Sequence, residues 1–167
     1  MFLKTGKMLT KIIIISALSF TLFISSTYFN IENIGNGEWE KFYENGAFYS
    51  IIKCNDSYIL VGDKYYENAP QEIVGQGWMV KIDKDGNLIW EKTYGSKNAS
   101  FSFARIIKDS KYFIIAGSKS YGNGDSDFWV VKVDEDGNEI WNKTYGSEEN
   151  DFLRSIIKTE DGYLLCG

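Results

Sequence analysis

Residues Trp78–Gly95 have the sequence WMVKIDKDGNLIWEKTYG, and residues Trp129–Gly146 repeat it as WVVKVDEDGNEIWNKTYG. The offset between the two copies is 51 residues (129 − 78), and it is constant along the stretch. A shorter copy of the second half begins at Trp39, again 51 residues (90 − 39) before its counterpart, Trp90. Self-similarity at a period near fifty residues indicates that similar structural units follow one another along the chain.

The predicted secondary structure of the repeat is β-strand. Three runs are continuously apolar, which predicts strands buried on both faces: Tyr58–Val61, Phe113–Ala116 and Tyr163–Cys166. The predicted strands are residues 39–43, 48–53, 58–62, 78–82, 88–94, 102–108, 113–117, 129–133, 139–145, 152–158 and 163–167. Four strands in a unit of about fifty residues fit the blade of a β-propeller. We therefore predict an all-β fold of four-stranded β-propeller-type blades, with two units and part of a third.

Trp90 and Trp141 occupy the same position in the two long copies. Tryptophan buries a large area and dominates the contacts in which it takes part. We therefore expect these two side chains to pack between adjacent blades and to dominate that interface.

The composition narrows the classes of function. The chain of 167 residues has no histidine, which removes His-based catalytic triads and imidazole metal sites. Acidic residues outnumber basic ones by 23 to 18, whereas nucleic-acid binding needs clustered Lys and Arg, so we expect no nucleic-acid partner. Cys54 and Cys166 lie in different positions of units about two blades apart, so we expect two separate thiols. We assign no catalytic residue, metal ligand or cofactor.

The first thirty residues have the features of a targeting segment. Residues 1–30 contain no acid, and three lysines precede the apolar run Ile12–Ile24. A basic start followed by a short apolar run predicts a secretory signal peptide, and an uncleaved membrane anchor at Ile12–Ile24 stays open as the alternative. We therefore expect a secreted or cell-surface protein, with a polar leader over residues 31–38 and the repeats over 39–167.

Each long copy contains an aspartate-rich segment, Asp83–Asn87 and Asp134–Asn138. An EF-hand calcium loop has glycine at its sixth position and an acid at its twelfth, and neither segment has this pattern. Asp and Asn bond to nearby backbone groups, and glycine adopts positive φ, so the pattern predicts a hairpin with a type I turn that ends in a left-handed glycine. Calcium binding at these turns stays open as the alternative.

The segment Val80–Gly95 resembles the blade repeat of quinoprotein-like β-propellers, in which an Asp-containing turn with glycine precedes a docking tryptophan. Asp127–Gly146 looks like the repeats of uncharacterised secreted propeller proteins of bacteria and archaea, and this likeness extends over residues 39–167. The resemblance implies a blade architecture. It implies no chemistry, because one fold serves many functions and no quinoprotein cofactor residue is matched in this sequence.

The two aspartate-rich segments also resemble, more weakly, the repeats of bulb-type lectins, whose sugar site follows the pattern Gln-x-Asp-x-Asn-x-Val-x-Tyr. Asp85 and Asn87 match the middle of that pattern, as do Asp136 and Asn138 in the second copy. The resemblance implies carbohydrate binding. The sequence departs from the pattern at the glutamine, which is replaced by Asp83 and Asp134, and at the tyrosine, which is replaced by Glu91 and Asn142.

The segments that differ most between copies are residues 63–77 and 118–128. Binding residues are often found on variable loops that a rigid scaffold positions. Aromatic and acidic side chains in these segments suit sugar or peptide ligands. The candidate ligand residues are Tyr65, Tyr66, Tyr121, Asp125 and Asp127.

The function that the sequence favours is a binding or interaction scaffold for a protein or glycan. The alternatives are a propeller enzyme, either a quinoprotein-like oxidoreductase or a glycan-active enzyme with its site in further blades, and a lectin-like repeat. Because a propeller closes with typically four to eight blades, we expect the chain to be part of a longer repeat protein. Assembly of several copies into one ring is the alternative, since open strand edges favour self-association.

Overall fold

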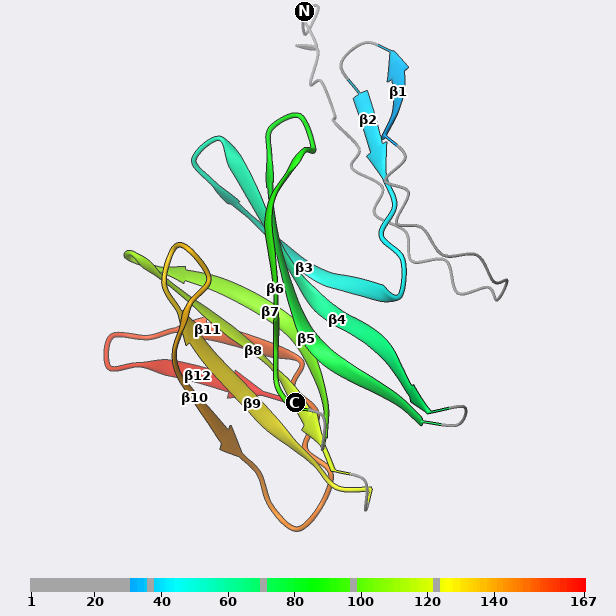
Figure 1. The fold of residues 1–167 in the computed structure, drawn as a ribbon. Coiled ribbons are helices and arrows are strands. Elements are labelled where there is room, and N and C mark those ends of the chain that lie inside the picture. The colour runs from blue at the N-terminus through cyan, green and yellow to red at the C-terminus, as the bar shows by residue number, and fades with distance from the viewer. Residues whose placement is uncertain (1–30, 36–37, 70–71, 97–98, 122–123) are drawn as a thin grey trace, which may run out of the picture.

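Two four-stranded sheets form most of the structure. The computed structural model describes residues 31–35, 38–69, 72–96, 99–121 and 124–167, and these ranges contain strands but no helix. The first sheet contains β3 (Gly46–Cys54), β4 (Ser57–Ala69), β5 (Glu72–Asp83) and β6 (Leu88–Tyr94), and the second contains β7 (Ser100–Asp109), β8 (Tyr112–Ser120), β9 (Ser126–Val133) and β10 (Glu139–Tyr145). In both sheets the antiparallel strands follow chain order (Figure 1). The prediction of an all-β chain with repeated four-stranded units is confirmed, and no sheet closes on itself within these ranges.

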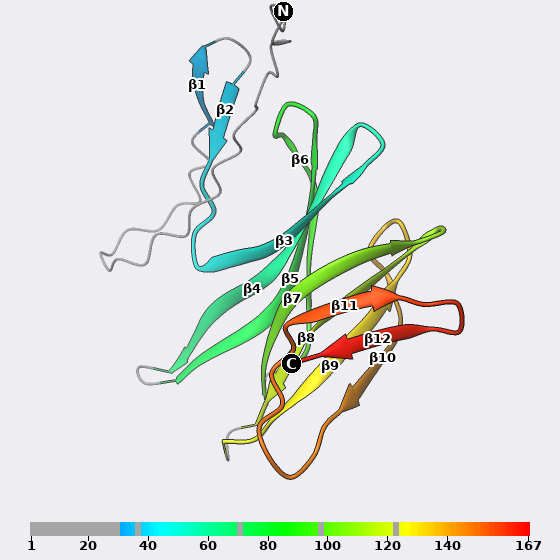
Figure 2. The same ribbon diagram turned by 180° about the vertical axis from the view of Figure 1, so that it is seen from behind.

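A two-stranded hairpin precedes the first sheet, and another follows the second. β1 (Ile31–Gly35) pairs with β2 (Glu38–Lys41), and β11 (Ser155–Lys158) pairs with β12 (Tyr163–Cys166). Strand structure thus begins inside the segment that the sequence assigns to a polar leader. β11 packs against β7, on the side of the second sheet that faces away from the first (Figure 2).

The two variable segments, residues 63–77 and 118–128, are largely strand rather than loop. β4 and β5 stay paired from Ser57↔Asp83 to Ala69↔Glu72, so the hairpin extends well beyond the predicted strand ends. β8 and β9 likewise stay paired as far as Ser120↔Ser126, where the two hydroxyl oxygens lie 2.6 Å apart. The expectation of two long loops is therefore wrong, because the backbone hydrogen bonds continue through residues whose polarity suggested solvated turns.

The sheets stack face to face through side chains that alternate along their central strands. In β4, Ile59 faces the second sheet and Leu60 faces the opposite side. In β8, Ile115 faces the first sheet and Ile114 faces β11 and β12. All four side chains are at most 1 % exposed. The prediction that the apolar runs of β4 and β8 are buried on both faces is confirmed.

The third apolar run, in β12, is covered on one face only. Leu165 packs into the cluster between the second sheet and the last hairpin, whereas Leu164 points away and is 60 % exposed. The prediction of burial on both faces is therefore wrong for β12, because no further sheet lies against its outer face among the described residues.

A tyrosine, a phenylalanine and a tryptophan meet where one unit packs on the next. Trp129 stacks on Phe103 with 4.8 Å between the ring centroids, and Tyr94 of the first sheet contacts Phe103 edge-on at 5.5 Å. The same trio occurs on the other face of the first sheet: Tyr43, Phe48 and Trp78. The repeat in sequence is therefore also a repeat in packing.

The two repeated tryptophan positions differ in burial. Trp78 and Trp129 lie on the central strands β5 and β9 and are 1 % and 2 % exposed. Trp90 and Trp141 lie on the edge strands β6 and β10 and are only half-buried. Trp90 does reach the interface between the sheets, where a Cβ on Gly137 would lie 3.0 Å from its ring. Trp141 likewise packs against the cluster between the second sheet and the last hairpin, so both tryptophans lie between units as expected. They do not dominate these contacts, because a central strand offers more cover than an edge strand.

Glycine is required where the first two strands of each sheet approach most closely. A Cβ on Gly62 would lie 1.7 Å from the carbonyl oxygen of Ala47, and one on Gly117 would lie 1.7 Å from that of Ser102. The pairing register shifts beside both positions, as at a β-bulge. Both sheets therefore bend at the same position of the repeat.

The apolar run Ile12–Ile24, the alternative membrane anchor, lies outside the described residues. Within them, no helix has the length and apolar character needed to span a bilayer.

Candidate binding cleft at the ends of the first strands

A cleft of about 530 Å³ lies where the two sheets and the last hairpin meet. It is bounded by β3 and β7, by the hairpin ends of β4, β5 and β8, and by the segment that leads into β11. Its lining residues are Tyr49, Asp63, Tyr65, Gly75, Ser100, Phe101, Ser102, Ala104, Ser118, Ser120, Phe152, Leu153 and Arg154. This volume is in the range of small-molecule sites, which are clefts with a few convergent polar groups.

Asp63 is the most unusual polar residue of the cleft, because its carboxylate is buried and only partly satisfied. The side chain is 6 % exposed. Its Oδ2 accepts hydrogen bonds from the hydroxyl of Tyr65 at 3.0 Å and that of Tyr49 at 3.4 Å. Its Oδ1 is buried and has no partner with good hydrogen-bond geometry among the described residues, although the Ser102 hydroxyl lies near enough to stabilise the ionised carboxyl. An unpaired buried acceptor costs about 1–3 kcal/mol, so a ligand that donates a hydrogen bond here would remove that cost.

Burial also controls the ionisation of this group. It raises the pKa of the Asp63 carboxyl above its ordinary value, and the hydrogen bonds from Tyr65, Tyr49 and Ser102 oppose that rise. Burial raises the pKa of both tyrosines as well, so their hydroxyls remain donors at neutral pH. The cleft therefore holds an acceptor between two phenolic donors.

Aromatic and hydroxyl groups line the rest of the cleft. Tyr49, Tyr65 and Phe152 keep ring surface exposed, which provides faces for stacking. Four serine hydroxyls line it, and they can both donate and accept: Ser100, Ser102, Ser118 and Ser120. The arrangement suits a hydroxyl-rich ligand that stacks on rings and donates hydrogen bonds to a carboxylate.

The structure separates the five residues that the sequence singles out as ligand candidates. Tyr65 lines the cleft, whereas Tyr66 is exposed on β4 without lining it. Asp125 and Asp127 belong to the β8–β9 hairpin, where the hydroxyl of Tyr121 donates to Asp127 Oδ2 at 3.2 Å. Only Tyr65 of the five is part of the cleft.

Sequence reasoning missed most of the cleft, although the repeat contains a signal for part of it. Asp63 follows Gly62 and Ser118 follows Gly117, so a polar residue comes directly after the close-approach glycine in both units. Both residues end the apolar run of their strand and line the cleft. No comparable signal identifies Tyr49, which sits in an ordinary strand pattern.

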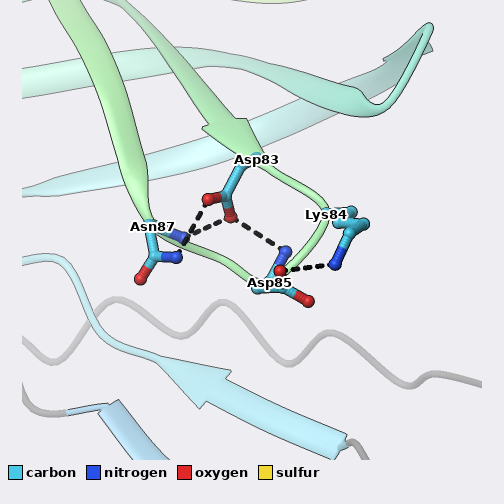
Figure 3. Close-up of polar contacts among 4 residues, drawn as sticks. All are labelled: Asp83, Lys84, Asp85 and Asn87. Atoms are coloured by element: carbon cyan, nitrogen blue, oxygen red, sulfur yellow. Dashed lines mark hydrogen bonds and ion pairs between the residues drawn. The ribbon is translucent and has the colours of Figure 1, made fainter.

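The aspartate-rich segments form the predicted turns. Asp83 Oδ1 accepts the backbone N–H groups of Asp85 and Asn87, both at 2.8 Å, and Oδ2 accepts the Asn87 side-chain amide at 2.9 Å (Figure 3). Gly86 has a φ of 84° and Gly137, in the second turn, a φ of 74°. The prediction of a turn that ends in a left-handed glycine is confirmed.

The second turn repeats these hydrogen bonds, with Asp134 as the acceptor for Asp136 and Asn138. In both turns the hydrogen bonds, foremost those from the asparagine, lower the pKa of the aspartate. Asn87 and Asn138, which match the lectin pattern, thus donate their side-chain amides to Asp83 and Asp134, the aspartates that replace the glutamine of that pattern. Among the described residues no cluster of three or more acidic or thiol groups is arranged to hold a metal ion.

Compared with known protein families and with curated proteins, the chain shows no significant match.

Proposed function

We propose that this chain is an extracytoplasmic β-propeller-type repeat protein that acts as a binding scaffold, and that its cleft takes a hydroxyl-rich ligand such as a glycan. Two observations support the architecture: the four-stranded units follow one another along the chain, and each packs face to face on the next. Blades of a propeller have this strand number and this kind of packing. The placement outside the cytoplasm rests on the basic and apolar pattern of residues 1–30, which lie outside the described residues.

The observation that carries the binding proposal is the unpaired Oδ1 of Asp63. A buried carboxylate oxygen without a partner lowers stability, and such strain is typical of functional positions. Sugar hydroxyls can donate hydrogen bonds to this carboxylate oxygen, and the exposed rings of Tyr49 and Tyr65 flank the carboxylate. Among the described residues that line the cleft, Asp63 is the only carboxylate, whereas glycoside hydrolysis uses a pair, so we favour binding over hydrolysis.

The test is a glycan array, followed by titration of the best glycan against the full chain and two variants. Asp63→Asn should weaken binding at least about tenfold, because the amide lacks the charge that strengthens hydrogen bonds from a ligand. Its melting temperature should stay equal or rise, because a neutral amide is easier to bury than a carboxylate. A position that only supports the fold would lose stability and binding together.

Two matched tyrosine variants test whether glycan binding depends on residues of the cleft. Tyr65→Phe removes a hydroxyl that bonds Asp63, and it should weaken glycan binding. Tyr121→Phe removes a hydroxyl that bonds Asp127 outside the cleft, and it should leave binding unchanged. Equal effects of the two variants, or no glycan bound by the parent protein, would contradict the proposal.

A further inference from the structure

The repeat brings the same strand position to the cleft three times. The first strand of each unit contains the tripeptide Ile-Ile-Lys, at residues 51–53, 106–108 and 156–158. The residue two places before the tripeptide is Tyr49 in the first unit, Ala104 in the second and Arg154 in the third, and all three line the cleft. β7 contacts both β3 and β11 and lies between them (Figure 2). The chain therefore presents an aromatic ring, a methyl group and a guanidinium in a row along the cleft.

The second strands of the first two units supply the hydrogen-bonding groups of the cleft. The residue after the close-approach glycine is Asp63 in the first unit and Ser118 in the second, and two places further along come Tyr65 and Ser120. All four line the cleft. The carboxylate of the cleft thus comes from the first unit and the guanidinium, that of Arg154, from the third. These two charged groups form no ion pair with each other.

The backbone at Arg154 is held in place by contacts with two other strands. The N–H of Arg154 donates to the carbonyl oxygen of Cys166 at 2.8 Å, and the N–H of Leu153 donates to the hydroxyl of Ser118 at 3.1 Å. Leu153 itself is buried between the second sheet and the last hairpin. Within the described part of the chain, no ion pair or side-chain hydrogen bond engages the guanidinium of Arg154. A fixed backbone thus carries a guanidinium that can bind a ligand.

The two charged groups of the cleft have different requirements. A guanidinium presents a rigid fork of N–H donors that matches the two oxygens of a carboxylate. Among the described residues that line the cleft, Arg154 is the only cation and Asp63 the only anion. A neutral sugar satisfies Asp63 but leaves the guanidinium to water. A sugar with a carboxylate at the Arg154 end and hydroxyls at the Asp63 end satisfies both groups, and its charge lies away from that of Asp63.

We propose that the cleft selects acidic glycans, with Arg154 binding the carboxylate of a uronic acid while hydroxyls of the same glycan donate to Asp63. The inference rests on the proposed glycan-binding function and adds the class of sugar. One guanidinium matches the single charge of a carboxylate, whereas a phosphate group, with nearly two negative charges, calls for more than one cation. Selectivity follows because the ion pair with Arg154 forms only when the sugar carries an acid.

The test compares acidic oligosaccharides with their neutral counterparts, using the full chain. Oligomers of glucuronic acid and of galacturonic acid are titrated by calorimetry, beside the same oligomers after reduction of their carboxyl groups and beside a sulfated oligosaccharide. The best acidic oligomer should bind at least about threefold more tightly than its reduced form, since an ion pair that stays partly solvated contributes modestly. Added salt should shrink this difference, because it screens the ion pair.

Two arginine variants provide the matched control. Both arginines of the chain are exposed, but only Arg154 lines the cleft. Arg154→Gln should weaken binding of the acidic oligomer at least about threefold, leave binding of the reduced oligomer unchanged and keep the melting temperature of the parent. Arg105→Gln, which removes a guanidinium that donates to the carbonyl oxygen of Ala104, should change the binding of neither oligomer.

The outcomes separate this inference from the proposed function. Equal binding of the acidic and reduced oligomers by the parent would overturn the inference and leave glycan binding intact. An equal loss for both oligomers in Arg154→Gln would do the same, because it indicates a purely structural role, and so would tighter binding of the sulfated oligosaccharide. If the parent binds none of these oligosaccharides and no glycan on the array, the inference and the proposed function are both overturned.

Discussion

The repeat has two tryptophan positions, and they occupy different environments in the structure. Trp78 and Trp129, on central strands, are buried and stack on a phenylalanine of the first strand in the same sheet. Trp90 and Trp141, on edge strands, keep part of their surface in solvent. Repetition therefore identifies positions that matter to the unit, whereas the place of a strand in its sheet decides how much each position contributes to stability.

The largest expected effect comes from removing a tryptophan of each kind from the same interface. Trp129→Ala should lower the free energy of unfolding by about 3–5 kcal/mol, because it leaves a cavity against Phe103 and Phe101. Trp90→Ala should cost about half as much, since its ring is already partly solvated. Urea denaturation followed by circular dichroism measures both. Equal losses would show that the edge position is as important as the central one.

The contact between Trp90 and the turn of the second unit can also be tested by substituting Gly137. Gly137→Ala should cost about 2 kcal/mol, because the residue has positive φ and the new methyl group would press on the Trp90 ring. Gly124→Ala is the control: its φ is also positive, but nothing lies within 4 Å of the added Cβ, so about 1 kcal/mol is expected. In a Trp90→Ala background the cost of Gly137→Ala should fall toward that of the control.

A hydrogen bond between the units should contribute less. The buried hydroxyl of Tyr94 donates to the carbonyl oxygen of Gly137 at 2.7 Å, so it joins the first sheet to the second turn. Tyr94→Phe keeps the ring contact with Phe103 and should cost about 1 kcal/mol. Tyr121→Phe, whose hydroxyl bonds Asp127 within its own hairpin, should change the urea midpoint by less.

The smallest effects are expected from pH, and they differ in sign between the turns and the cleft. Hydrogen bonds lower the pKa of Asp134, so its contribution is present above about pH 3.9, the ordinary value, and is lost as pH falls through the lowered pKa. Burial raises the pKa of Asp63, so the folded state binds its proton more tightly, and protonation adds stability as pH falls through that raised value. At neutral pH the urea midpoint of Asp134→Asn should lie below that of the parent and the midpoint of Asp63→Asn at or above it, and both differences should shrink as the pH is lowered.

Much of the fold could be predicted from the sequence because its signals are local. Tyr58–Val61 and Phe113–Ala116 predict doubly buried strands from their apolar runs, and the structure has them in β4 and β8. The turn at Gly86 follows from residues that are near neighbours in sequence. The lengths of the hairpins were not predictable in the same way. Residues 63–77 are polar and varied, and only their pairing across β4 and β5 makes them strands.

The candidate site was harder to predict than the fold, since its residues come from separate elements. Tyr65 could be predicted because an aromatic residue in a variable segment suits contact with a sugar or peptide ligand. Asp63 was not, because an aspartate after a glycine usually belongs to a solvated turn. Its burial depends on Tyr49 from β3 and on the neighbouring sheet, and neither is close to it in sequence.

The sequence by itself determined the period of 51 residues, the strand class and the two aspartate turns, because hydrogen-bonding side chains, glycine and apolar runs act over a few residues. The tertiary structure alone decided which tryptophan is buried, where Asp63 meets its tyrosines, and which apolar faces stay open. Those properties depend on what packs against a side chain from another unit. A repeated sequence places the same residue in every unit, but only the neighbouring unit decides whether that residue meets protein or solvent.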